Sequence, residues 1–116
     1  MKILIAEDDP LTILLYEIGL KKDDIRVCFN GVDFIMAYSS DYDVFILDLM
    51  MPIKNGFEVV DFLKGIGNKV PIVIVTAYGL IEAEAVAKLD VCLIIEKPIK
   101  ASELRTKIEK YISCAS

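Results

Sequence analysis

The sequence predicts an α/β fold in which helices cover both faces of a doubly wound, five-stranded parallel sheet. Five short apolar runs alternate along the chain with helix-like patterns. Continuous apolar runs of this length are typical of strands buried on both faces, and their alternation with helices is typical of right-handed βαβ units. The length of 116 residues fits one domain, so residues 1–116 are expected to fold as a single unit.

The expected strands are the apolar runs themselves. They cover residues 3–6, 25–29, 44–47, 72–75 and 92–95. Open parallel sheets bind ligands beyond the carboxyl ends of their strands, at the switch in strand order. The residues that directly follow these runs are therefore the candidates for a functional site.

The helices are expected between the strands. The first should begin after Asp9, a favourable N-cap, with Pro10 in the first helical position. Residues 32–38 are expected to form a short helix, a longer one should start near Gly56, and Ser102 is a candidate cap for the last. The other signals are apolar residues at helical spacing: Leu11, Leu14, Leu15 and Ile18; Val59, Val60, Leu63 and Ile66; Ile81, Ala85, Val86 and Leu89; Leu104, Ile108, Tyr111 and Ile112.

Composition and charge exclude several classes of function. The chain is 55% hydrophobic with a formal net charge of −5, which favours a packed core and argues against nucleic-acid binding. No apolar run approaches the roughly 20 residues of a membrane helix, and acidic residues end the first run too early for a signal peptide. We therefore expect a cytoplasmic protein.

Histidine is absent from the chain, which excludes Ser-His-Asp and Cys-His catalysis and His-rich zinc sites. The chain therefore cannot carry a phosphohistidine of its own. Its three cysteines are too far apart for a CxxC motif. We interpret Cys28 and Cys92 as small buried side chains and Cys114 as a loose C-terminal thiol.

Five polar side chains follow the apolar runs. Glu7 and Asp8 come after the first run and Asp48 after the third. Thr76 and Lys97 come after the fourth and the fifth. Three carboxylates packed against one ammonium group require a cation or a proton to offset their charge.

Oxygen ligands without histidine or cysteine favour Mg²⁺, with Mn²⁺ or Ca²⁺ as substitutes. Such a site suits phosphoryl transfer, and an aspartate is a known nucleophile that forms an aspartyl phosphate. Thr76 could hydrogen-bond one phosphoryl oxygen, and Lys97 could neutralise another.

These residues resemble the receiver domain of two-component response regulators, over essentially the whole chain. The resemblance rests on residues in a fixed order: Glu7-Asp8, Asp48, Met51-Pro52, Gly56, Thr76-Ala77 and Lys97-Pro98. Each motif alone is weak, but the ordered set is highly specific. The resemblance implies a flavodoxin-like (βα)5 fold.

The resemblance also implies roles for single residues. Asp48 would be the phosphoacceptor, and Mg²⁺ would be held by Glu7, Asp8, Asp48 and the backbone carbonyl of Met50. Thr76 would be the switch hydroxyl and Lys97 the phosphate-binding lysine. The Lys97-Pro98 peptide bond is expected to be cis.

The implied function is a phosphorylation-activated signalling switch rather than an enzyme in the ordinary sense. A histidine kinase or histidine phosphotransfer protein would supply the phosphoryl group. Phosphorylation would then change the surface near helix four, strand five and helix five. That change would act on a downstream effector or an output domain, and could drive formation of a homodimer. Met50 and Tyr78 flank the expected phosphoryl position and are bulky, so we expect slow self-dephosphorylation.

Three departures from the family pattern keep an alternative open. Glu7 stands where the family more often has Asp, and Ile94 replaces the aromatic switch residue. The approach to the last strand, residues 90–93, is unusually apolar. The alternative is a degenerate receiver that acts as an interaction or dimerisation module without phosphorylation. A haloacid-dehalogenase-type phosphohydrolase is disfavoured, because the second Asp it needs is replaced by Met50.

Overall fold

The computed structural model describes residues 1–77, 91 and 93–115, and it contains the expected parallel sheet. Its strands are β1 (Lys2–Ala6), β2 (Asp24–Cys28), β3 (Val44–Leu47), β4 (Ile72–Ala77) and β5 (Leu93–Lys97). All neighbouring strands pair in parallel, in the order β2-β1-β3-β4-β5. This is the flavodoxin-like order, whose switch point lies between β1 and β3.

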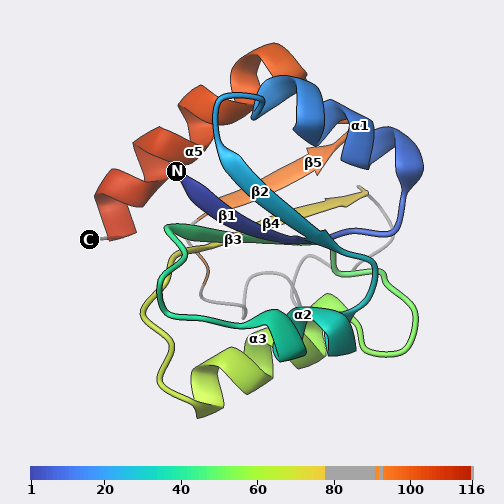
Figure 1. The fold of residues 1–116 in the computed structure, drawn as a ribbon, viewed down its shortest axis with the longest axis vertical. Helices are drawn as coiled ribbons and strands as arrows, with labels where there is room; N and C mark the ends of the chain where they lie inside the picture. The colour runs from blue at the N-terminus through green and yellow to red at the C-terminus, as the bar shows by residue number, and fades with distance from the viewer. Residues whose placement is uncertain (78–90, 92, 116) are drawn as a thin grey trace.

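In the part of the chain that the structure describes, helices cover both faces of the sheet (Figure 1). α1 (Pro10–Gly19) and α5 (Ala101–Ala115) lie on one face, and α2 (Gly31–Ala37) and α3 (Gly56–Gly65) lie on the other. The helix expected around residues 81–89 and the side chains of Tyr78, Cys92 and Cys114 lie outside the described residues. No helix in the described part of the chain is long and apolar enough to cross a membrane.

The core consists of two layers, because successive side chains of a strand point to opposite faces. In β1, Ile3 and Ile5 face the layer under α1 and α5, whereas Leu4 and Ala6 face the layer against α2 and α3. β3 is buried throughout, as expected. Burial on both faces was a wrong expectation for β2 and β5, because they are the edge strands; Ile94 in β5 is 42% exposed.

The first helix is confirmed, but the apolar stripe that predicted it is not its buried face. Leu11, Leu14 and Ile18 are 63%, 51% and 54% exposed, and the buried residues of α1 are Thr12 and Tyr16. Asp9 caps the helix by accepting a hydrogen bond from the backbone N–H of Thr12, as predicted. Because helix residues four apart share a face, Thr12 and Tyr16 lie on the same side of α1, and this is its buried side.

The other described helices agree with the sequence, with two corrections. α3 begins with a capping box between Asn55 and Glu58 and buries Val59, Val60 and Leu63, as predicted. Ile66, the last residue of the predicted stripe, is instead the C-cap of α3 and is 46% exposed. α5 begins at Ala101, so Ser102 lies inside its first turn and was wrongly expected to be its cap.

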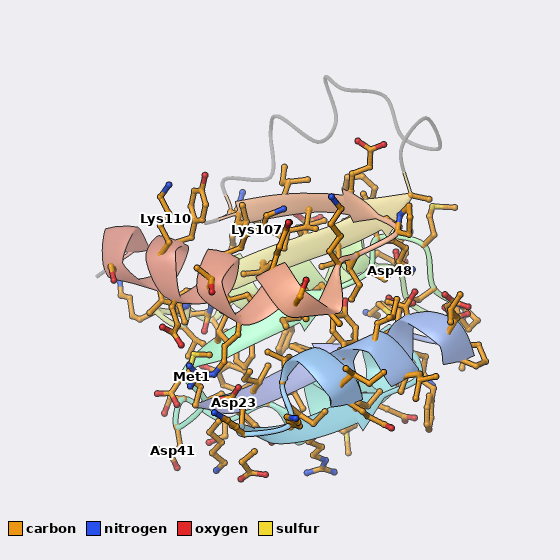
Figure 2. The ribbon with its side chains drawn as sticks, turned by 90° about the horizontal axis from the view of Figure 1, so that it is seen from above. Met1, Asp23, Asp41, Asp48, Lys107 and Lys110 are labelled. Atoms are coloured by element: carbon orange, nitrogen blue, oxygen red, sulfur yellow. The ribbon has the colours of Figure 1, made fainter. Side chains whose placement is uncertain are left out.

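An ion cluster joins α5 to the amino-end edge of the sheet. The Asp23 carboxylate, fully buried, accepts hydrogen bonds from the amino group of Met1 at 2.8 Å and from Arg105 Nε at 3.0 Å and Nη2 at 3.2 Å. Figure 2 shows Met1 and Asp23 at one end of the strands and Asp48 towards the other. The molecule therefore buries charged side chains at both ends of its strands. We call these ends the amino edge of the sheet, around Asp23, and the carboxyl edge, around Asp48.

Candidate acidic site at the carboxyl edge of the sheet

The two central strands bring Glu7 and Asp48 to the same edge. Ala6 and Leu47 are paired in the register of β1 and β3, so the acids directly follow paired residues. The backbone N–H of Asp48 donates to the carbonyl of Ala6 at 3.0 Å, which continues the pairing into the site. Glu7 is 0% exposed and Asp48 is 4% exposed, whereas Asp8 faces solvent.

Lys97, at the end of β5, joins the two buried acids. Its ammonium Nζ lies 2.8 Å from Asp48 Oδ2 and 3.0 Å from Glu7 Oε2. Glu7, Asp8 and Asp48 each offer a carboxylate oxygen, and these three oxygens lie within 4.8 Å of one another. The structure thus brings together four of the residues that the sequence predicted for the site.

The loop after β3 fixes the position of Asp48. The backbone N–H of Met50 donates to Asp48 Oδ1 at 3.1 Å. Gly56 lies so close to this strand end that a Cβ atom there would stand 2.5 Å from the Asp48 carbonyl oxygen. Gly56 therefore has a packing role, and a larger residue would displace the loop. The carbonyl of Met50 as a metal ligand stays a prediction.

Asp9 and the Lys97-Pro98 bond complete the frame of the site. The backbone N–H of Asp9 donates to Glu7 Oε2 at 3.2 Å, while its own carboxylate caps α1. The hydrogen bond from Thr12 holds the pKa of Asp9 below its usual value. The peptide bond between Lys97 and Pro98 is cis, as predicted.

Among the described residues of the site, acidic groups outnumber cationic groups. Burial, together with the neighbouring charge of Asp48, raises the pKa of Glu7 to about 7, although Lys97 acts in the opposite direction. Burial alone would lower the pKa of Lys97, but its hydrogen bonds to Asp48 and Glu7 raise it. One ammonium group therefore faces two buried carboxylates and a third, exposed one.

Three buried polar atoms of the described residues have no hydrogen-bond partner: Glu7 Oε1, Thr76 Oγ1 and Tyr16 Oη. Buried polar atoms are nearly always paired, so each of these requires an explanation. Thr76 lies at the carboxyl edge, next to the end of β5, but its hydroxyl bonds neither Asp48 nor Lys97. Tyr16 was not predicted from the sequence, because the apolar residues at helical spacing indicated a different face of α1.

The donor set fits a hard divalent cation such as Mg²⁺, the ion that the family resemblance implies. The side-chain candidates of the acidic cluster all offer carboxylate oxygens, and among the described residues Glu7 Oε1 lacks a partner. Asp8 is exposed, which leaves one side open to water and to a ligand oxygen. Mg²⁺ prefers one or two carboxylates with several waters and a phosphate oxygen. The acidic cluster can supply the carboxylates, and its exposed side can admit the waters and the phosphate oxygen.

Comparison with known proteins gives one consistent picture. The family model for the response regulator receiver domain matches residues 3–109. The transcriptional regulatory protein CusR of Escherichia coli is 39% identical over 87 residues, which cover 71% of this chain and 37% of that protein. CiaR, a transcriptional regulatory protein of Streptococcus pneumoniae, is 32% identical over 115 residues, or 97% of this chain and 51% of that protein.

Solved structures support the same fold. The signal receiver domain of a LuxO repressor protein from Vibrio parahaemolyticus matches with a TM-score of 0.85 at 28% identity, and the match covers 98% of this chain and 91% of that one. A BeF3-activated DrrB receiver domain matches with a TM-score of 0.82 at 20% identity, covering 97% of each chain, which supports the fold alone. The chain spans between about a third and a half of the length of the two curated relatives described above.

Proposed function

Because this chain belongs to the response regulator receiver domain family, we propose that it is a phosphorylation-dependent signalling switch with Asp48 as its phosphoacceptor. The observation that carries this assignment is the contact of Lys97 with both buried acids, at 2.8 and 3.0 Å, within a cluster of three carboxylates. A simple ion pair joins one cation to one acid, whereas Lys97 contacts two acids and a third carboxylate lies close to them.

The proposed reaction moves a phosphoryl group from a phosphohistidine, or from a small phosphodonor, to Asp48. A carboxylate oxygen of Asp48 forms a bond to phosphorus while the bond from phosphorus to the donor nitrogen breaks, and the electron pair stays on the imidazole. Lys97 already contacts Asp48 Oδ2, so it is placed to neutralise a phosphoryl oxygen on the product. The Met50 N–H on Oδ1 holds the carboxylate in one orientation.

Glu7, Asp8, Asp48 and the Met50 carbonyl are the proposed holders of Mg²⁺, which Mn²⁺ or Ca²⁺ could replace. When bound, the cation supplies positive charge to the phosphoryl oxygens during transfer. Asp8 offers the exposed carboxylate and Glu7 the buried one. The raised pKa of Glu7 means that its proton must leave before it can ligate, which couples metal binding to pH.

Thr76 is the proposed switch residue. Its buried hydroxyl has no partner in the described part of the chain, and a phosphoryl oxygen on Asp48 would provide one. Movement of Thr76 and Lys97 towards the phosphoryl group would alter the surface around β5 and α5. The exposed Ile94 in β5 stands where the family has an aromatic residue. A partner protein that binds this surface is therefore expected to meet a side chain of different shape.

The proposed phosphodonor partner is a histidine kinase or a histidine phosphotransfer protein, because the chain has no histidine of its own. α1 begins three residues after Glu7 and presents Leu11, Leu14 and Ile18 to solvent. This apolar face lies beside the acidic site, so we propose that the donor protein packs against it while its phosphohistidine reaches Asp48.

The rest of the proposal concerns context. The curated relatives are named as transcriptional regulators, so a downstream effector or an output domain is the proposed receiver of the signal, with a phosphorylation-linked homodimer as one form. We propose a cytoplasmic location and one receiver domain in residues 1–116. Met50, which is 52% exposed beside the acceptor, is proposed to slow loss of the phosphoryl group by water.

The test is the intact mass after incubation with acetyl phosphate, with Mg²⁺ or with EDTA. We expect one phosphoryl adduct that requires Mg²⁺ and persists after removal of the donor. If neither acetyl phosphate nor a phosphohistidine protein yields an adduct, the chain acts as an interaction module without phosphorylation. Rapid loss of the adduct would contradict the proposed slow hydrolysis.

A further inference from the structure

Tyr16 is an unusual core residue because none of the described residues forms a hydrogen bond with its buried hydroxyl. The side chain is fully buried in the layer under α1 and α5, among Ile3, Ile5, Ile95 and other aliphatic residues. Its hydroxyl has no hydrogen-bond partner among the described residues. A phenylalanine or leucine would fill a purely apolar site without this cost.

The same layer contains a second unpartnered atom of complementary type. Along β1, Ile3 and Ile5 face α1 and α5, and the same alternation sends Glu7 to that side. Glu7 Oε1 is a buried acceptor without a donor, and the Tyr16 hydroxyl is a buried donor without an acceptor.

Charge shows that the phenol lies near the acidic site. Besides burial, the charges that raise the pKa of Tyr16 are those of Glu7 and, next, Asp48. A tyrosine phenol is protonated at neutral pH even at its ordinary pKa of about 10, so the hydroxyl is available as a donor. No cation of the described residues is among the groups that shift it.

We propose that Tyr16 is a positioning residue for Glu7: its hydroxyl donates to the free oxygen Oε1, directly after a small rotation or across one buried water. Such a bond from the core side would fix the rotamer of Glu7 and leave Oε2 for Lys97 and the Asp9 N–H. Groups that orient a ligating carboxylate in this way commonly control metal affinity. The link to metal affinity rests on the proposed function, whereas the contact itself does not.

The contact is tested by a double-mutant cycle on metal-free protein, with Tyr16→Phe and Glu7→Met. Tyr16→Phe removes only the hydroxyl, and Glu7→Met removes both acceptors at similar volume. We expect Tyr16→Phe to lower the folding equilibrium constant about fivefold in the wild type and less than twofold in Glu7→Met. An equal effect in both backgrounds, or a gain in stability from Tyr16→Phe, would overturn the contact.

The positioning role is tested by binding of Mn²⁺ alone, followed by electron paramagnetic resonance of the free ion. We expect Tyr16→Phe to raise the Mn²⁺ dissociation constant about tenfold. The matched control is Tyr42→Phe, in the opposite core layer, which should leave it unchanged. A coupled cycle with unchanged affinity would overturn the positioning role. Absence of Mn²⁺ binding by the wild type would instead contradict the proposed metal site, and the cycle would still decide the contact.

Discussion

The two edges of the sheet both bury carboxylates, but they treat the charge in opposite ways. At the amino edge, one carboxylate meets two cationic groups: Asp23 accepts from Met1 and twice from Arg105, so both of its oxygens are occupied. At the carboxyl edge, Glu7 and Asp48 share the ammonium group of Lys97, and Glu7 Oε1 has no partner among the residues that the structure describes.

We interpret the amino-edge cluster as one that stabilises the fold, and the carboxyl-edge cluster as the proposed binding site. Burial opposes ionisation of Asp23, but hydrogen bonds from Arg105 and the Met1 amino group hold its pKa below the usual value. Burial raises the pKa of Glu7 to about 7. The amino edge is therefore electrostatically complete, whereas the carboxyl edge is stabilised further by anything that brings positive charge.

The largest expected effect follows from removal of the nucleophile. Asp48→Asn keeps the size of the side chain and one of its two acceptor oxygens, but it removes the charge and cannot form an acyl phosphate. We expect complete loss of the phosphoryl adduct, measured by intact mass with acetyl phosphate and Mg²⁺. Asp23→Asn is the matched control at the other edge and should be phosphorylated like the wild type. An adduct on Asp48→Asn would place the phosphoacceptor elsewhere.

Acid should affect the two edges with opposite sign. The pKa of Glu7 is raised from 4.5 to about 7, so its folded form holds a proton that the unfolded chain has lost. Stability from this group is present below about pH 4.5 and is lost as pH rises towards 7 and above; the expected loss is about 2–3 kcal/mol. The pKa of Asp23 is lowered, so its contribution disappears only as pH falls below the ordinary value of 3.8.

Urea unfolding at pH 5 and pH 8 in EDTA measures this difference. We expect the wild type to be less stable at pH 8, and Glu7→Gln to lose most of that difference because the amide does not titrate. Equal pH dependence in the two proteins would show that Glu7 ionises normally.

A smaller loss is expected when the amino-edge cluster is broken. Asp23→Asn removes the anion that Arg105 and the Met1 amino group share, although Arg105 is partly solvated and keeps its ion pair with Glu109. We expect a decrease of about 2 kcal/mol in the free energy of unfolding, with no change in Mg²⁺ binding. A change in metal affinity would show that the two edges are coupled through the sheet.

The smallest effect is expected on the exposed face of α1. Leu14→Glu places a charge on the surface that we assign to the phosphodonor, so transfer from a phosphohistidine protein should slow about tenfold. Transfer from acetyl phosphate and the stability should stay unchanged, because Leu14 is 51% exposed. Met36→Glu, on α2 and 81% exposed, is the matched control. Equal slowing by both variants would exclude a specific role for α1.

Much of the fold could be predicted from the sequence because its signals are local. Buried strands β1 and β3 are continuous apolar runs, and Asp9-Pro10 marks the start of α1 through cap chemistry. The burial of edge strands could not be predicted, since edge position depends on strand order. The buried face of α1 could not be predicted either. The spacing of Leu14 and Ile18 indicated a face that packs on the core, but these residues are exposed and Tyr16 is buried.

The residues of the candidate site could be predicted from the sequence, but their contacts and their burial could not. Residues that end parallel strands must share an edge, so Glu7, Asp48 and Lys97 could be grouped from the sequence. No pattern indicates that Lys97 contacts both acids or that Glu7 is completely buried. These features arise from packing between α1, α5 and the sheet, which brings together residues far apart in the chain.

The most direct test of the account is the effect of Mg²⁺ on unfolding of the wild type and of Asp23→Asn at pH 8. At a Mg²⁺ concentration about twenty times the dissociation constant, binding to the folded state alone adds about 1.8 kcal/mol to the free energy of unfolding. We expect this gain in both proteins, and its loss in Asp48→Asn. If Mg²⁺ does not stabilise the wild type, the carboxyl edge is not a cation site and the contrast between the two edges fails.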